Sequence, residues 1–210
     1  MKLLPLCFFL GLALSARSAE ISLQIKSAKG EAVADAVVSL VPVEGTVPPV
    51  SATARVEIEQ EGQEFQPYVT VVQTGTRVVF PNHDNVQHHV YSLSKAKKFE
   101  LPLYNPGNAE SLVFDTPGLV TVGCNIHDWM ISHLLVVPTP WFAKSDDKGV
   151  ATITAPAGRY RLELWHPRLA AVQSREVTLT DATAASADFS LTLKADRRVR
   201  RSSGNKGSGY

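Results

Sequence analysis

Three side chains able to bind a soft metal ion lie close together in the segment Cys-Asn-Ile-His-Asp-Trp-Met. They are Cys124, His127 and Met130, each separated from the next by two residues. A thiolate, two imidazoles and a weak axial thioether form the His2Cys-Met set that binds copper in one-electron transfer sites. The segment supplies three of these four donors. It therefore predicts one bound copper ion as the cofactor, with a second histidine required from elsewhere.

The second imidazole has three upstream candidates, His83, His88 and His89. Adjacent residues of a strand face opposite sides of a sheet, so His88 and His89 cannot both point into one site. A turn histidine such as His83 is ordinarily solvated. The residue types alone leave the choice among these three open.

Cys124 is expected to be the single cysteine of an exported protein. Residues 1–19 combine a basic start, an apolar run and small residues, which is typical of a cleaved signal peptide that would also remove Cys7. No later stretch has the roughly 20 apolar residues of a membrane helix. We therefore expect a periplasmic or otherwise exported chain without a transmembrane segment, whose thiol cannot form an internal disulfide. A lone buried thiol is ordinarily inert, but its neighbours His127 and Met130 favour a metal ligand.

Strands must position these side chains, because nearly every periodic stretch after the signal alternates with period two and none keeps a helical stripe. Cys124 ends one such stretch, and another follows the loop after Met130. Turns rich in Gly, Pro and Asp separate the runs. The expected strands are residues 21–25, 68–72, 77–80, 89–93, 111–114, 119–123, 134–137, 159–165, 177–179 and 188–193. Short strands of this kind predict an all-β protein built of β-sandwiches.

The order of the motifs predicts two sandwiches, one inserted into the other. Residues 30–40 resemble the start of the carboxypeptidase regulatory-like, or prealbumin-like, sandwich. The rest of that pattern, an Asp-x-x-Gly turn and Pro-x-Gly-x-Tyr-x-Leu, occurs at 146–162, after the metal-binding segment. We expect a discontinuous sandwich of residues 20–45 and 146–193 with residues 55–140 inserted at a loop, where insertions are tolerated. Two consecutive domains are the alternative.

Residues 65–138 resemble the cupredoxins, the plastocyanin and amicyanin group of small blue copper proteins. They are most similar to exported cupredoxin-domain proteins described as methylamine utilisation proteins. The motifs that carry the resemblance are Phe80-Pro81-Asn82-x-Asp84 leading to His88, the turn Pro106-Gly107, Phe114-Asp115-Thr116-Pro117-Gly118, and Cys-x-x-His-x-x-Met followed by a strand. The resemblance implies a Greek-key β-sandwich with one type 1 copper, and an edge of the downstream ligand histidine at the surface.

The ligands that this resemblance implies are His88, Cys124, His127 and Met130. His88 has the spacing of the family's upstream ligand, just before an apolar strand residue. The chain departs from the family pattern at two positions: His89 replaces an Asn that braces the ligand loop, and Asp128 replaces a Pro. His133 and His166 are expected to be structural or surface residues. Trp129 could either form part of a docking patch or pack in its loop.

The predicted function is to carry single electrons between redox partner proteins. No catalytic residue is expected, since nucleophile elbow, zincin, phosphate-loop and His-x-His patterns are lacking. One alternative is copper handling or delivery. Another is a carbohydrate- or protein-binding module with an accessory copper site, in which Trp141 and Trp165 form an aromatic face.

The charges are unevenly distributed along a chain whose formal net charge is +1. The body is acidic, whereas residues 194–210 are basic and lack apolar periodicity, which predicts a disordered tail. Such a tail could touch anionic surfaces weakly. No nucleic-acid partner is expected.

Overall fold

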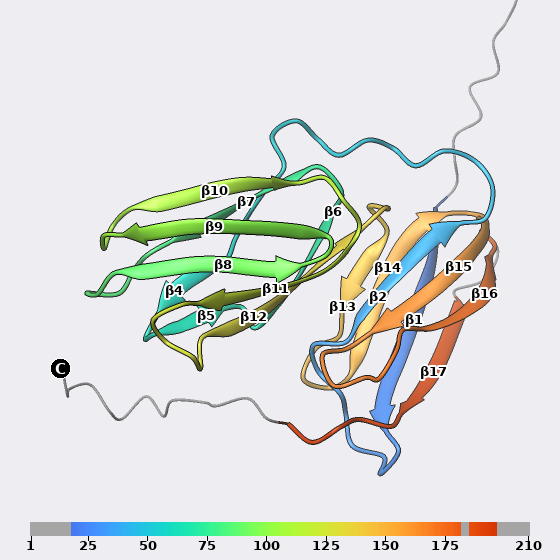
Figure 1. The fold of residues 1–210 in the computed structure, drawn as a ribbon. Helices are drawn as coiled ribbons and strands as arrows, with labels where there is room; N and C mark the ends of the chain where they lie inside the picture. Colours follow the sequence, from blue (N-terminus) through green and yellow to red (C-terminus); the bar gives the residue numbers. More distant parts are fainter. Residues whose placement is uncertain (1–17, 182–184, 197–210) are drawn as a thin grey trace, which may run out of the picture.

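The computed structural model describes residues 18–181 and 185–196. All of its regular structure is strand, which confirms the predicted all-β class (Figure 1). Helices that could cross a membrane are absent from this part of the chain. The strands are β1 (Ser18–Ser27), β2 (Val37–Pro42), β3 (Arg55–Glu57), β4 (Glu59–Glu61), β5 (Glu64–Gln66), β6 (Val69–Gln73), β7 (Thr76–Pro81), β8 (His88–Ser94), β9 (Lys97–Tyr104), β10 (Ala109–Phe114), β11 (Gly118–Cys124), β12 (Ile131–Val137), β13 (Phe142–Lys144), β14 (Val150–Pro156), β15 (Gly158–Trp165), β16 (Gln173–Leu179) and β17 (Ala185–Leu191).

The first and last strands of the chain build one unit, which we call the terminal sandwich. Its sheets have the orders β14-β1-β17 and β13-β2-β15-β16. Ile21, Leu23 and Ile25 alternate along β1 and are at most 1% exposed, since they point into the core between the two sheets. Burying each such side chain stabilises the fold by about 1.5–3 kcal/mol. β1 pairs antiparallel with β14 and parallel with β17, so distant segments of the chain share this core.

Strands β3 to β12 build a second unit, the central sandwich, between the two halves of the first. A five-stranded sheet of order β6-β12-β11-β8-β9 faces a three-stranded sheet of order β10-β7-β3, and β4 and β5 form a separate hairpin (Figure 1). Phe80 and Phe114 fill the space between the sheets together with the inward side chains of β11, Val120 and Val122. Cys124 and Met130 belong to the same buried cluster. The metal-binding segment therefore starts from a rigid core strand.

Periodicity alone missed β9. It contains Pro102, which cannot donate a ladder hydrogen bond and therefore weakens any strand prediction. The structure places β9 at the edge of the five-stranded sheet, paired only with β8, where a proline is tolerated.

The two sandwiches meet through a few polar and aromatic contacts. Lys144 donates from Nζ to the Val69 carbonyl at 3.1 Å and forms an ion pair with Asp35 at 3.1 Å. The ring of Trp165 lies edge-on to that of His133, with centroids 5.9 Å apart. His133 therefore packs at the boundary between the sandwiches, as the structural residue that was expected.

Both predicted terminal segments fall largely outside the described residues. Of the signal segment, only Ser18 and Ala19 are described, and they begin β1 opposite Pro156 and Ala155. The first strand of the terminal sandwich therefore includes the last two residues of the predicted signal, Ser18 and Ala19. Of the tail, residues 194–196 are described. Lys194 is bonded twice to Arg168: its N–H donates to the Arg168 carbonyl, and its carbonyl accepts from Arg168 Nε.

Candidate metal centre

The loop after β11 holds two of the predicted ligands at fixed places. Cys124 is 3% exposed at the end of a strand whose alternate side chains are buried. The loop that follows closes on itself, because the N–H of Cys124 donates to the Met130 carbonyl at 3.2 Å and the N–H of Met130 donates to the His127 carbonyl at 2.9 Å. Met130 is 1% exposed. The backbone thus positions Cys124 and Met130 within the core and leaves His127 half-buried at the loop.

The donor atoms of His88, Cys124 and His127 form a compact triangle. The Cys124 Sγ lies 3.7 Å from His88 Nδ1 and 3.6 Å from His127 Nδ1, and all three donor atoms lie within 4.8 Å of one another. In zinc sites the donor atoms lie about 2.0–2.3 Å from the metal ion. Three donors at such distances, placed at equal angles in one plane with the ion, would lie about 3.7 Å from one another. The triangle therefore has the size of a trigonal metal site. Among the described residues, this is the one group of at least three His, Cys, Asp or Glu side chains whose donor atoms lie close enough together to hold a metal ion.

The alternation of side chains along β8 decides which upstream histidine enters this triangle. The pairing of β8 with β9 shifts between His88 and Val90, and both of these side chains are fully buried. His89 faces the other way, and its Nε2 contacts Glu100 Oε1 at 2.9 Å. His83 is exposed in the preceding turn. Of the three candidates, the structure brings only His88 next to Cys124.

A carboxylate orients the His88 ring from the side opposite the thiol. Asp84 Oδ2 lies 2.7 Å from His88 Nε2, so the ring has Nδ1 directed at Cys124 and Nε2 held by Asp84. Asp84 is itself fixed, since its N–H donates to Asn82 Oδ1 at 3.0 Å. Asn82 Nδ2 also donates to the Val86 carbonyl at 2.9 Å, which braces the ligand loop from a position before His88. The motif containing these residues was recognised in the sequence, but the role of Asp84 was not.

The turn between β4 and β5 joins the supports of both histidines. The N–H groups of Gly62 and Gln63 donate to the two oxygens of Asp84 at 2.6 and 2.9 Å. The Gln63 carbonyl accepts from Trp129 Nε1 at 3.0 Å, and the Trp129 ring lies 5.2 Å from that of His127. Gly62 and Gln63 both have positive φ, 66° and 56°, the conformation of a two-residue type I′ hairpin turn. Because Gly-Gln is not a common sequence for this turn, the hairpin was not predicted.

Of the two open residues in the ligand loop, Trp129 is anchored and Asp128 is solvent-exposed. Trp129 is half-buried against the central core, so it packs in its loop through a hydrogen bond and a ring contact. Asp128 points into solvent next to it.

The thiol and the imidazole each favour the charged form of the other. Burial acts to lower the pKa of His88, yet hydrogen bonds and opposite charge from Cys124 and Asp84 outweigh it and leave this pKa raised. Burial acts to raise the pKa of the Cys124 thiol, but the hydrogen bond with His88 and backbone hydrogen bonds with His89 and Ile126 leave it lowered. The metal-free site therefore tends toward a thiolate–imidazolium pair.

These pKa shifts predict the pH dependence of the metal-free protein. The stabilisation from Cys124 is present above the ordinary thiol pKa and is lost as the pH falls through its lowered folded value. The contribution of His88 is present below its ordinary pKa and is lost as the pH rises through its raised value. We expect ultraviolet thiolate absorption to titrate below the ordinary thiol pKa, and His88→Gln to move that titration upward. An unchanged titration in His88→Gln would contradict the pairing.

Asp84→Asn is expected to weaken copper binding by roughly 10–100-fold, the usual effect of removing an outer-shell carboxylate from a ligand histidine. The substitution removes the charge that holds His88 Nε2 and weakens both hydrogen bonds from the β4–β5 turn. Competition with a chromophoric chelator measures the affinity. Asp115→Asn is the matched control, because Asp115 is an exposed carboxylate that contacts Lys97. Equal copper affinities of the Asp84→Asn and Asp115→Asn variants would show that Asp84 does not support the site.

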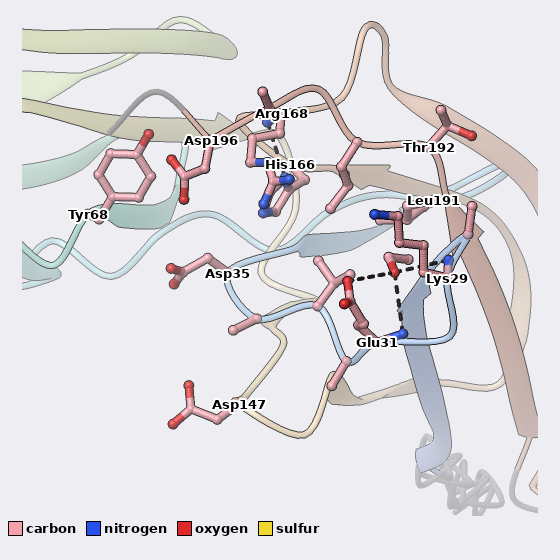
Figure 2. A pocket seen from close by; sticks show the side chains of 17 residues that line it. Lys29, Glu31, Asp35, Tyr68, Asp147, His166, Arg168, Leu191, Thr192 and Asp196 are labelled. Atoms are coloured by element: carbon pink, nitrogen blue, oxygen red, sulfur yellow. Dashed lines mark hydrogen bonds between the residues drawn. The ribbon is translucent and has the colours of Figure 1, made fainter. Parts of the chain in front are cut away.

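A cavity of about 720 Å³ at the boundary of the sandwiches is a separate feature (Figure 2). Tyr68 reaches it from the central sandwich, and the labelled Asp35, His166 and Arg168 come from the terminal sandwich. His166 is 6% exposed, and its Nδ1 accepts a hydrogen bond from the Arg168 N–H at 3.1 Å. This bond identifies His166 as a structural residue of the terminal sandwich.

Comparison with known proteins gives only partial structural likenesses. No protein-family model matches the chain, and no curated protein matches it. A purple cupredoxin from Nitrosopumilus maritimus is 24% identical, with 40% of this chain and 99% of that chain covered and a TM-score of 0.35. A Cu(I) amicyanin mutant is 18% identical, with 41% and 85% covered and a TM-score of 0.38. The copper-containing nitrite reductase of Thermus scotoductus is 23% identical, with 46% and 25% covered and a TM-score of 0.39, so this chain spans a quarter of that enzyme.

Proposed function

We propose that this chain is an exported type 1 copper protein that carries single electrons between redox partners and is not itself an enzyme. The observation that carries the proposal is the triangle of His88, Cys124 and His127, with Sγ to Nδ1 distances of 3.7 and 3.6 Å, in which a closed backbone loop holds Cys124 and His127. Two imidazoles and a thiolate are the equatorial donors of blue-copper sites. Met130, buried beside them at the end of the loop, would be the weak axial ligand.

Bound copper would supply one-electron cycling between Cu(I) and Cu(II). The residues of the chain would hold the ligands nearly fixed during that cycle, which keeps the structural change small. Cys124 would bind as thiolate, a form that its lowered pKa already favours. Asp84 would keep His88 Nδ1 directed at the site, and the half-buried His127 would present its edge toward a partner.

The proposed domain organisation follows from the strand pairing. Residues 55–140 would be a cupredoxin domain inserted between the parts 20–45 and 146–193 of a carboxypeptidase regulatory-like sandwich. The pairing of β1 with both β14 and β17 supports this arrangement. A signal peptide at residues 1–19 would direct the chain to the periplasm or beyond.

The alternative of a carbohydrate-binding face has less support. Trp141 packs edge-on against Tyr160 with ring centroids 5.6 Å apart, and Trp165 packs against His133 at 5.9 Å. Both tryptophans are partly buried by these contacts rather than aligned on one open surface. Copper handling without a redox role is the second alternative, and electrochemistry separates it from electron transfer.

The proposal is tested by expression with copper, metal analysis, optical spectroscopy and cyclic voltammetry. An electron carrier should bind one copper per chain, absorb intensely in the visible range and give a reversible one-electron couple. Copper binding without a reversible couple would instead support a handling role. Failure to bind copper would overturn both.

A further inference from the structure

The five-stranded sheet of the central sandwich presents an exposed apolar surface on its outward side. Leu93 is 77% exposed, the highest value for any large hydrophobic side chain in the described residues. Ile131 at 44% and Leu119 at 37% lie on the neighbouring strands β12 and β11. We call the outward residues Tyr91, Leu93, Leu119, Gly123 and Ile131 the β8–β11 face. Exposed apolar groups gathered on one sheet face are typical of interaction surfaces.

This face lies directly over the residue before the thiol ligand. Gly123 is paired with Ile131 on β12 and with Tyr91 on β8, and Cys124 follows it opposite Val90. A Cβ atom at Gly123 would lie 3.2 Å from the Tyr91 ring, so the ring covers the backbone at this point. Tyr91 is half-buried. A molecule seated on the face would therefore be separated from Cys124 by Tyr91 and one residue of backbone.

Two exposed lysines, Lys95 and Lys98, border the face on the β9 side. Lys98 is paired across the strands with Leu93, and Lys95 lies exposed in the adjoining turn. Of the two nearby carboxylates, Asp115 contacts Lys97 at 3.7 Å, and Glu100 contacts the His89 imidazole at 2.9 Å. Two exposed lysines, Lys95 and Lys98, against the single carboxylate Glu100 leave this border positive on balance.

The opposite border is formed by the terminal sandwich. A cleft of about 720 Å³ separates Thr121 and Ile131 from Arg168 and Lys194. Asp128 and Asp196 also line this cleft, so its charges are mixed. Lys95 and Lys98 on one side and Arg168 and Lys194 on the other thus flank the apolar centre.

We propose that the β8–β11 face is the docking surface for an acidic one-electron redox protein. The inference rests on the proposed copper function. Apolar contact at Leu93 and Ile131 would exclude water, and Lys95 and Lys98 would steer the negatively charged partner. A second copy of this chain fits less well, because two copies would bring the same lysines together. One electron would leave the reduced centre of the partner and reduce Cu(II) to Cu(I) by way of the strand that ends in Cys124, with no proton or bond exchanged.

The test compares two charge reversals that change the net charge equally. Lys95→Glu with Lys98→Glu alters the proposed surface, and Lys26→Glu with Lys29→Glu alters exposed lysines of the terminal sandwich. The anionic reductant hexacyanoferrate(II) serves as the probe. At low salt, the first double variant should react roughly 10-fold more slowly than the second, and added salt should remove the difference, as expected for steering by local charge. Equal rates would overturn the proposal, because the anion would then enter elsewhere.

A second measurement maps the contact without relying on bound copper. Hexacyanochromate(III), a paramagnetic anion, should broaden the amide signals of Leu93, Lys98 and Gly123 in the metal-free protein. Broadening confined to the loop around Ile126 and His127 would overturn the proposal. Dimerisation that Leu93→Asp abolishes would replace the acidic partner with a second copy. The two proposals fail separately: loss of the reversible couple rejects the copper function, whereas an intact couple with equal rates rejects only the docking surface.

Discussion

Replacing Cys124 with serine is expected to abolish the intense visible absorption of the copper-loaded protein. That absorption depends on a copper–thiolate bond, and the serine hydroxyl is a harder donor that stays protonated at neutral pH. Copper affinity should fall by more than the roughly 10–100-fold that follows loss of an outer-shell group. Spectroscopy of copper-loaded protein and chelator competition measure the two effects.

The controls for this substitution lie in adjacent histidines. His88→Gln should lose the strong band as well, because Nδ1 of His88 is one corner of the triangle. His89→Gln should keep it, since His89 contacts Glu100 on the other side of the strand. An intense band surviving in Cys124→Ser, or lost equally in both histidine variants, would contradict the proposed site.

Gly149→Ala is expected to lower the free energy of unfolding of the terminal sandwich by roughly 2–6 kcal/mol, because backbone strain and overpacking add. Gly149 has φ 74°, which disfavours any residue with a Cβ. The added Cβ would lie 2.2 Å from the Ile25 carbonyl oxygen, a contact that side-chain movement cannot relieve. The Gly149 carbonyl also accepts a hydrogen bond from the Ile25 N–H at 2.7 Å, so the shift would break a hydrogen bond between β1 and the turn before β14.

Gly30→Ala separates the two causes of that destabilisation. Gly30 has φ 84°, yet a Cβ there would meet nothing within 4 Å. It should therefore cost only the backbone strain of about 1–3 kcal/mol. Urea unfolding followed by circular dichroism compares the variants. Equal losses in Gly149→Ala and Gly30→Ala would show that the close contact with Ile25 contributes nothing.

The Gly149→Ala variant also tests whether the two sandwiches are separate domains. If residues 55–140 fold as an inserted unit, Gly149→Ala should lower one unfolding transition while the visible band of bound copper persists to the wild-type temperature. A single transition that moves as a whole, with simultaneous loss of the band, would mean that the two cores unfold together.

The sequence by itself determined the strand class and the local part of the site. Alternation of buried and exposed residues, as along Ile21, Leu23 and Ile25, is a property of neighbouring residues, so it predicts strands without knowledge of their partners. This confirmed the all-β class. The spacing of Cys124, His127 and Met130 is likewise local, since one loop carries all three. The boundaries of the two sandwiches and the binding of copper remain predictions.

Only the tertiary structure decided which distant groups meet these local elements. Strand alternation turns His88 inward and His89 outward along β8, and which of the two faces the core is decided by the pairing of β8 with the distant strand β11. The hairpin turn at Gly62 and Gln63 holds both Asp84 and Trp129 through backbone groups. Because nearly every residue has these groups, the residue types in the sequence do not indicate such contacts. The β8–β11 face also depends on register, because Gly123, Tyr91 and Ile131 become neighbours only when three strands pair. Residue type and spacing specify what a segment can bind, whereas long-range pairing specifies which segments come together.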